Sequence, residues 1–139
     1  MFTPCDSTDI PALAGMLRGL GPTGEAGLRD DLAAAMDAGA QLRAYRVGGV
    51  PRGYLVWRWQ GGEGPRRAVL EHIWVEPSWR RRGVARRLIA GFEAEIAGQG
   101  AQGWITRVEA ANAPSRALML GAGAIGAVEV LEKRLQAPA

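Results

Sequence analysis

The stretch that decides the fold is Val69–Ile96, which reads VLEHIWVEPSWRRRGVARRLIAGFEAEI. Its first part, Val69–Val75, is apolar apart from Glu71 and His72 and is rich in β-branched and aromatic residues. This composition predicts a largely buried β-strand. Pro77 ends the strand, because a proline has no backbone N–H to donate to a neighbouring strand.

An amphipathic helix is predicted to begin at Val84, where the spacing of the apolar residues changes to that of a helix. Its apolar face consists of Ala85, Leu88, Ile89, Phe92 and Ile96. Charged residues occupy the other positions, so one side of the helix is expected to pack against a core while the other meets solvent.

A basic turn, Arg80–Ala85, joins the predicted strand to the predicted helix. The first backbone N–H groups of a helix have no partner within the helix, and the helix dipole favours negative charge there. Gly83 has no Cβ, so a phosphate can approach its backbone closely. Physical chemistry alone therefore predicts that this turn binds a phosphate-bearing ligand. The predicted contact residues are Arg80, Arg81, Arg82, Gly83, Val84 and Ala85.

The turn resembles the Arg/Gln-x-x-Gly-x-Gly/Ala motif of the GNAT superfamily, the acetyl-CoA-dependent N-acetyltransferases. Arg80, Gly83 and Ala85 occupy its defining positions, and the preceding Val-x-Pro and the following Leu88 also suit the family. The resemblance implies an α/β (α+β) fold with a mixed central sheet of six to seven strands, about four flanking helices, and a splay between the fourth and fifth strands. A single domain, residues 1–139, is expected to bind acetyl-CoA and an amine acceptor.

Composition narrows the class of protein. The 139 residues are 47% hydrophobic, which is enough for a sizeable core in one domain. The net charge is only +3, and the arginine cluster lacks interleaved aromatic residues, so a nucleotide-like cofactor is favoured over nucleic acid. Nucleic-acid binding is kept as a third alternative.

Compartment is inferred from what the sequence lacks. Cys5 is the only cysteine, so no internal disulfide can form. No apolar run approaches the length of a membrane span, and the first residues show no signal-peptide pattern. We expect a soluble cytoplasmic protein with no metal and no membrane partner. The sequence does not set the oligomeric state, and a homodimer stays open.

Upstream of the decisive stretch, the sequence predicts three strands and two helices. The strands are Phe2–Cys5, Gln41–Val47 and Val50–Gln60, of which the last two are joined by a Gly48-Gly49 hairpin turn. The first helix follows the cap residues Ser7–Asp9, and its apolar stripe is Leu13, Met16, Leu17 and Leu20. The second helix is closed by Gly39, and its apolar stripe is Leu28, Leu32, Ala35 and Met36.

Two groups of residues in this part of the chain have alternative interpretations. Trp57 and Trp59 share one face of their strand, and they either pack in the core or shape an acceptor pocket. The second group consists of three aspartates of the second helix, which either form a solvated helix face or contact a cationic acceptor: Asp30, Asp31 and Asp37.

Downstream, a helix from Arg116 to about Gly121 is expected between the strands Trp104–Ala110 and Ala127–Leu135. In the family, the strand after the motif helix separates from the central strand, and the amide-rich arm of the cofactor pairs in the gap like an added strand. The resemblance therefore implies cofactor contacts from Ile73, Trp74 and Val75. Asn112 either contacts the cofactor or caps the following helix.

Acetyl transfer to an amine requires a base, often acting through water, and a donor for the oxygen that becomes negative. By resemblance, Glu71 is the candidate base and the Ile73 N–H the candidate donor, because several family members carry a glutamate or histidine at this distance before the motif arginine. Period two places Glu71 on the face of Ile73 and Val75, in an apolar setting that suits a base, with His72 opposite as a weaker candidate. The alternative is a structural glutamate paired with Arg58 or Arg107.

One family feature is missing. Many members have a tyrosine in the penultimate helix that protonates the leaving thiolate, and Met119 occupies that position here. A thioether cannot donate a proton, so Tyr54, Tyr45 or water would serve, or the thiolate leaves unassisted. Two functions stay open: an N-acetyltransferase that acts on a primary amine of a small molecule or peptide, and a catalytically weak acyl-CoA-binding or sensor module.

Overall fold

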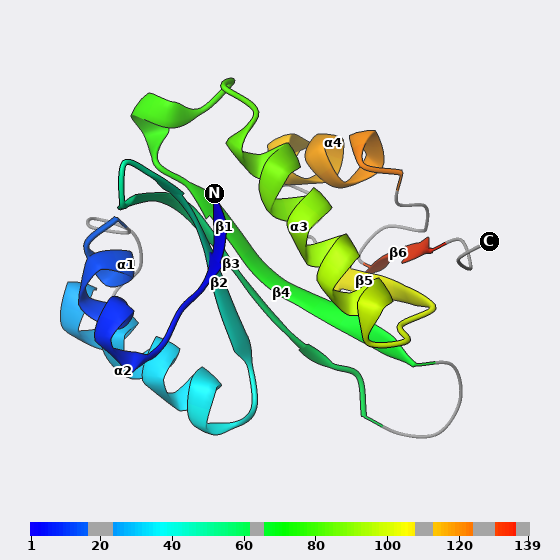
Figure 1. The fold of residues 1–139 in the computed structure, drawn as a ribbon, viewed down its shortest axis with the longest axis horizontal. Helices are drawn as coiled ribbons and strands as arrows, with labels where there is room; N and C mark the ends of the chain where they lie inside the picture. Colours follow the sequence, from blue (N-terminus) through cyan, green and yellow to red (C-terminus); the bar gives the residue numbers. More distant parts are fainter. Residues whose placement is uncertain (17–23, 62–65, 108–112, 124–129, 136–139) are drawn as a thin grey trace. The chain divides into compact units, whose positions relative to one another are not determined.

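The computed structural model describes residues 1–16, 24–61, 66–107, 113–123 and 130–135. Within them, the strands form one sheet in the order β1-β2-β3-β4-β5-β6 (Figure 1). The strands are β1 (Phe2–Pro4), β2 (Gln41–Val47), β3 (Val50–Trp59), β4 (Arg67–Val75), β5 (Gly103–Arg107) and β6 (Val130–Arg134). The α-helices are α1 (Ile10–Met16), α2 (Gly24–Asp37), α3 (Val84–Gly98) and α4 (Ala113–Gly121), and two short 3₁₀ helices are η1 (Ser7–Asp9) and η2 (Pro77–Trp79).

The sheet is mixed, as predicted. β4 and β5 are parallel, whereas β1 pairs with β2 and β5 pairs with β6 in antiparallel fashion. The described chain divides into two compact units, Met1–Val56 with His72–Leu88 and Trp57–Glu71 with Ile89–Ala139. No helix of the described residues combines the length and the apolar character needed to cross a bilayer.

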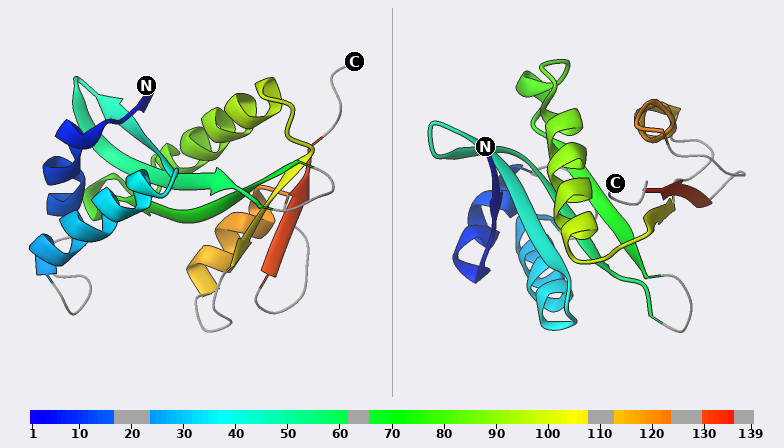
Figure 2. Two further views of the ribbon diagram at one scale, coloured as in Figure 1. Left: turned by 90° about the horizontal axis from the view of Figure 1, so that it is seen from below. Right: turned by 45° about the vertical axis from the view of Figure 1, so that its right-hand side comes forward.

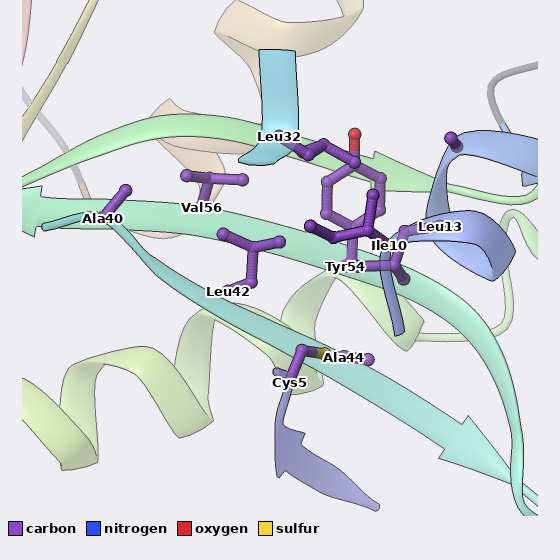
Figure 3. Packing of buried hydrophobic residues seen from close by; sticks show 10 residues of the cluster. Cys5, Ile10, Leu13, Leu32, Ala40, Leu42, Ala44, Tyr54 and Val56 are labelled. Atoms are coloured by element: carbon purple, nitrogen blue, oxygen red, sulfur yellow. The ribbon is translucent and has the colours of Figure 1, made fainter. Parts of the chain in front are cut away.

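The first unit is built on a core to which α1, α2 and the strands β2 and β3 contribute. The side chain of Asp6 accepts a hydrogen bond from the Thr8 N–H, and the Asp9 side chain accepts one from the Asp6 N–H. This capping box starts η1, from which the chain continues into α1. α1 and α2 lie beside each other (Figure 1). The side chains of the core in Figure 3 include Cys5, Ile10, Leu13, Leu32, Ala40, Leu42, Ala44, Tyr54 and Val56.

Several local predictions for the first unit are confirmed. Gly39 follows α2 in a left-handed conformation with φ 98°, as expected for a glycine that closes a helix. Gly48 and Gly49 have φ values of 59° and 81°, which is the conformation that a two-residue hairpin between β2 and β3 requires. Three aspartates of α2 are exposed, as expected for a solvated helix face, and they are Asp30, Asp31 and Asp37. Leu17 and Leu20 lie outside the described residues.

The second unit has an aromatic core. Phe92 of α3 packs between Trp57 and Trp104, with 5.9 Å between ring centroids in both pairs. Trp57 is 1% exposed, so the core interpretation of this residue is correct. β5 and β6 run side by side in opposite directions, from Gly103 opposite Arg134 to Arg107 opposite Val130 (Figure 2). The parts of the two predicted C-terminal strands that extend beyond β5 and before β6, residues 108–110 and 127–129, lie outside the described residues.

The central strand β4 differs from its prediction in two respects. We predicted a largely buried strand. Only Ala68 and Leu70 are buried, whereas Glu71 and His72 are exposed and the other residues of the strand are half-buried. The strand also contains a β-bulge. The Gln60 N–H donates to the Arg67 carbonyl, and the Glu76 N–H donates to the Arg52 carbonyl. Between these two hydrogen bonds, the β4 side of the ladder contains one residue more than the β3 side. Strict period-two alternation therefore does not hold along the whole strand, and the face that Glu71 shares with Ile73 and Val75 stays a prediction.

The predicted splay between β4 and β5 is confirmed. Their register runs only from Arg67 opposite Gly103 to Leu70 opposite Thr106, and β4 continues to Val75. At the last paired position, the Thr106 hydroxyl donates a 2.8 Å hydrogen bond to the Leu70 carbonyl. Thr106 is also the one buried polar residue among the described residues. This side-chain hydrogen bond therefore lies at the last paired position of β4 and β5.

Candidate active site

The turn between β4 and α3 has an unusual backbone. After η2, Arg80 is extended, Arg81 has a φ of 64° and Gly83 has a φ of 80°. The Arg87 N–H then donates to the Gly83 carbonyl, so helical hydrogen bonding begins at this point. Arg81 is the only residue other than glycine in the described chain that has a positive φ. A left-handed arginine is a conformation that the surrounding structure must hold in place.

This backbone is suited to an anion. Alternation of left- and right-handed residues turns successive N–H groups toward one side, and the first turn of α3 adds N–H groups that have no partner within the helix. A Cβ placed on Gly83 would meet no atom within 4 Å, so the surface above this residue is open. The residues predicted to contact a phosphate thus lie together in one turn, with Val84 buried beneath it and Arg81, Arg82 and Gly83 exposed.

Stacked side chains hold the arginines of the turn. The Arg80 Nε–H donates a 3.1 Å hydrogen bond to the Val75 carbonyl, and the Arg80 guanidinium lies 4.6 Å from the centroid of the Trp74 ring. The guanidinium groups of Arg82 and Arg52 each lie 4.8 Å from the centroid of Trp79. These contacts fix the positive charge near the start of α3 instead of leaving it on freely rotating chains.

The β4 residues predicted to line the cofactor end directly before this turn. Ile73, Trp74 and Val75 are all half-buried, and Trp74 packs against the core of the first unit. The structure places these residues and the basic turn in the same unit. Asn112 lies outside the described residues.

Glu71 does not have the apolar setting that we predicted for it. The residue is exposed, and its Oε1 accepts a hydrogen bond from Arg58 Nε in an ion pair. The alternative of a glutamate paired with Arg58 is therefore correct as a description of its contacts. These contacts engage one carboxylate oxygen, and the role of Glu71 as a base stays a prediction.

His72 packs against Tyr54, with the ring centroids 5.4 Å apart and the planes tilted by 52°. Part of the imidazole surface is exposed, but the packed side holds it out of water, and this desolvation lowers the pKa of His72 below its ordinary value. The ring is therefore neutral near pH 7.

The sequence did not reveal a group of unpaired polar atoms on β3 and β4. Within the described residues, three buried side-chain atoms have no hydrogen-bond partner, and they are Arg52 Nε, Tyr54 Oη and Trp74 Nε1. Burial raises the pKa of the Tyr54 hydroxyl above its ordinary range, so the phenol stays protonated. A sequence signal did exist, because Arg52 and Tyr54 alternate on a strand that is otherwise apolar at its centre.

No tyrosine takes the place of Met119. Met119 is buried in α4 with 2% exposure, and its thioether has no proton to give. Of the two alternatives, Tyr45 accepts a 2.6 Å hydrogen bond from Arg87, and Tyr54 is fully buried. The identity of a proton donor for the leaving thiolate therefore stays open between these residues and water.

Comparisons with known proteins agree with this geometry. The model of the acetyltransferase (GNAT) family matches residues 19–123. A GNAT-family protein from Desulfovibrio desulfuricans superposes with a TM-score of 0.82 at 13% identity, over 96% of this chain and 98% of the other. The ribosomal-protein-S18-alanine N-acetyltransferase of Escherichia coli gives 0.80 at 18% identity, over 100% and 96%.

An aminoglycoside N-acetyltransferase solved in complex with CoA gives a TM-score of 0.75 at 20% identity, over 98% of this chain and 91% of the other. A search of curated protein sequences gave no match. The likeness to solved structures establishes the fold, and the family model spans most of the chain, including the basic turn. The protein therefore belongs to the GNAT family of acetyltransferases.

Proposed function

We propose that the protein is an N-acetyltransferase that moves an acetyl group from acetyl-CoA to a primary amine of a small molecule or peptide. The observation that carries the proposal is the turn from Arg80 to Ala85. It combines two left-handed residues, the first N–H groups of a 15-residue helix and clustered guanidinium groups. Family membership makes a CoA diphosphate the natural ligand for such a turn.

The turn fits a diphosphate on structural grounds. The backbone N–H groups of residues 81–85 would hold its oxygens, and the open surface above Gly83 leaves room for them. Arg81 and Arg82, both exposed, would add charge-assisted hydrogen bonds. When bound, acetyl-CoA supplies the activated thioester.

Two residues of β4 would carry the chemistry. The Ile73 N–H would donate to the oxygen that becomes negative during the transfer. Glu71 would accept a proton from the amine through a water molecule, using the carboxylate oxygen that Arg58 does not engage. The exposure of Glu71 favours the route through water, because a water molecule can reach this side chain.

The second candidate function is an acyl-CoA-binding module without turnover. One observation favours it, namely the buried Met119 at the position where many family members carry a proton-donating tyrosine. Such a module would keep the basic turn and its affinity for CoA while lacking transfer activity.

A titration of acetyl-CoA by calorimetry, followed by an amine screen with thiol detection, tests both functions. Cys5 is buried and its pKa is raised to about 11, chiefly by burial, so the protein's own thiol contributes little to the signal. We expect 1:1 binding and CoA release with at least one class of amine. Absence of binding by the folded protein would overturn the proposal, and binding without release across the panel would favour the module.

The variant Glu71→Gln tests the proposed base. We expect its turnover to fall by roughly 10²–10⁴-fold with CoA affinity unchanged, as for loss of a general base. The control is Asp37→Asn, which removes another exposed carboxylate at the end of α2 and should leave turnover intact. Equal turnover in Glu71→Gln and wild type would remove Glu71 from the mechanism.

A further inference from the structure

Three donor groups in the first unit lack partners, and this absence is informative. Arg52 Nε, Tyr54 Oη and Trp74 Nε1 are buried, and each has no hydrogen-bond partner among the described residues. Native structures contain few such groups, because an unpaired buried donor has lost its bonds to water and gained none in return. Three of them on two neighbouring strands therefore indicate a partner that the described residues do not supply.

The register brings the three groups together. Arg52 and Tyr54 are two residues apart on β3, so they share one face of the strand. The bond from the Glu76 N–H to the Arg52 carbonyl sets these two residues opposite each other. Tyr54 comes two residues after Arg52 on β3, and Trp74 comes two residues before Glu76 on β4. Because the strands run in opposite directions, Tyr54 therefore lies opposite Trp74, and residues opposed in this way are close neighbours. The donors thus gather on the face that carries the core of the first unit, against which Trp74 packs.

The chemistry of the missing partner follows from the donors. The Arg52 Nε and the Trp74 indole nitrogen can only donate hydrogen bonds. Because burial raises the pKa of the Tyr54 hydroxyl, this group also has a proton to donate. The Arg52 Nη1 already donates to Glu76 Oε2 at 3.1 Å, which leaves the Arg52 Nε for another acceptor. The partner must therefore offer acceptor oxygens, as a carbonyl or carboxylate does.

The surroundings of Tyr54 are apolar. In Figure 3 its ring extends among Ile10 and Leu13 of α1 and Leu32 of α2, with the hydroxyl pointing away from Cys5 and Ala44. On the same face, the exposed Arg80 guanidinium covers the Trp74 ring at 4.6 Å. The stacked guanidinium lies on the exposed side of Trp74, which is the side from which a ligand would approach this ring.

We propose that Tyr54, Trp74 and Arg52 bind a carbonyl or carboxylate oxygen of the acceptor substrate. The acceptor is then an amine that carries such a group next to its amino group, as in an amino-acid amide or the N-terminus of a peptide. This inference rests on the proposed acetyltransferase function and adds the substrate class. Simple alkylamines and polyamines lack the oxygen and leave the three donors unpaired, which is a strong basis for rejection.

Matched acceptors test the inference. Phenylalaninamide and phenethylamine differ in structure only by the carboxamide group. Because this group also lowers the pKa of the neighbouring amine, each kcat/KM is expressed per neutral amine, and the ratio of the two values then isolates recognition of the oxygen. We expect the wild type to prefer the amide by roughly a hundredfold or more. In Tyr54→Phe and Trp74→Phe the ratio of the two kcat/KM values should fall at least about tenfold, chiefly through a higher KM for the amide. A preference that is absent in the wild type or unchanged in both variants would overturn the inference.

The stability of Tyr54→Phe separates a binding role from a structural one. Because the hydroxyl has no partner among the residues that the structure describes, its removal should leave the urea midpoint of unfolding unchanged or higher. The control is Tyr45→Phe, the same chemical change at a hydroxyl bonded to Arg87, which should leave the substrate preference unchanged. A clearly lower midpoint in Tyr54→Phe, or an equal fall in kcat for both amines, would assign the hydroxyl to packing or to proton transfer instead.

Failure of the inference is distinguishable from failure of the proposed function. Calorimetry with acetyl-CoA reports the basic turn alone, and Tyr54→Phe should bind it as the wild type does. If CoA binds but no amine is acetylated, the two matched amines are compared as ligands of the CoA complex. Tighter binding of phenylalaninamide that is lost in Tyr54→Phe would support the oxygen site without turnover, and equal binding would overturn it.

Discussion

Three tryptophans of the described chain place their indole N–H groups in different kinds of surroundings. In the second unit, Trp57 donates to Glu95 at 3.2 Å and Trp104 donates to Glu93 at 3.3 Å. In the first unit, the buried indole nitrogen of Trp74 has no partner among the described residues. The second unit thus uses its polar groups for internal stability, whereas the first keeps donors unpaired beside the basic turn.

One buried hydroxyl group of each unit shows the same difference. Thr106 of the second unit donates to the Leu70 carbonyl, and Tyr54 of the first unit donates to no described residue. Folding alone selects against unpaired buried groups, so a unit that retains them has been shaped by another requirement. Binding and catalysis are the usual requirements of this kind, which is why we place substrate recognition in the first unit.

The largest expected effect concerns the network of the second unit. Glu93 accepts from Trp104 and forms an ion pair with Lys133 at 2.8 Å, with less than a fifth of its side chain exposed. Glu93→Ala leaves both partners unpaired, so we expect a loss of about 2–3 kcal/mol in the free energy of unfolding. Urea unfolding measures this value. A loss comparable to that of an exposed control such as Asp31→Asn would show that the network contributes nothing.

The second prediction moves to the basic turn of the first unit. Gly83→Ala places a Cβ on a residue with φ 80°, which should lower stability by about 1–2 kcal/mol and weaken acetyl-CoA binding by roughly tenfold or more. Gly49→Ala is a matched control, because Gly49 has a φ of 81° and similarly open surroundings in the β2–β3 hairpin. Equal CoA affinity in the two variants, measured by calorimetry, would contradict the proposed role of the turn.

A third prediction tests the contrast between the two hydroxyls. Thr106→Val keeps the shape of the side chain but leaves the Leu70 carbonyl without this donor, so stability should fall by about 1 kcal/mol. Thr106→Ser retains the hydroxyl and should preserve the hydrogen bond. If Thr106→Val and Tyr54→Phe shift the urea midpoint by the same amount, the difference between paired and unpaired hydroxyls has no energetic meaning.

The smallest effect is a dependence of stability on pH. Since the pKa of His72 is lowered in the folded protein, the unfolded chain binds a proton at a higher pH than the folded one does. Stability should therefore fall as the pH drops through the ordinary histidine range near ~6.5. His72 is the only histidine, so His72→Gln should flatten the change in urea midpoint between about pH 7.5 and 5.5. A rise in wild-type stability over this interval would contradict the prediction.

Local signals made much of the fold predictable. The strand, proline, basic turn and helix of residues 69–96 appear in the structure as β4, η2 and α3, because each signal acts within a few residues. The signal for the Gly48-Gly49 hairpin was equally local, since the turn needs only two consecutive residues that adopt positive φ values, as glycine does. In α3, Leu88, Ile89, Phe92 and Ile96 are buried as the spacing predicted, while Ala85 is half-buried and Val84 takes its place.

The candidate site was less predictable because it depends on pairing between strands. The bulge in β4 interrupts the assumed alternation, and its one sequence signal was the polar pair Glu71 and His72 inside an apolar strand. The side chain of Arg58, thirteen residues before Glu71, decided what surrounds that carboxylate. Whether the Tyr54 and Trp74 donors find partners depends on every side chain that packs around them, which no local pattern records.

The ion pair between Lys133 and Glu93 has a consequence for how such a protein behaves in its own assay. Lys133 is the only lysine of the sequence, and its ammonium group is held by a carboxylate. An amine so engaged offers no lone pair to a thioester, so the side chains present almost nothing that could be acylated by mistake. Lys133 should therefore stay unmodified during prolonged incubation with acetyl-CoA, and peptide mapping by mass spectrometry measures this.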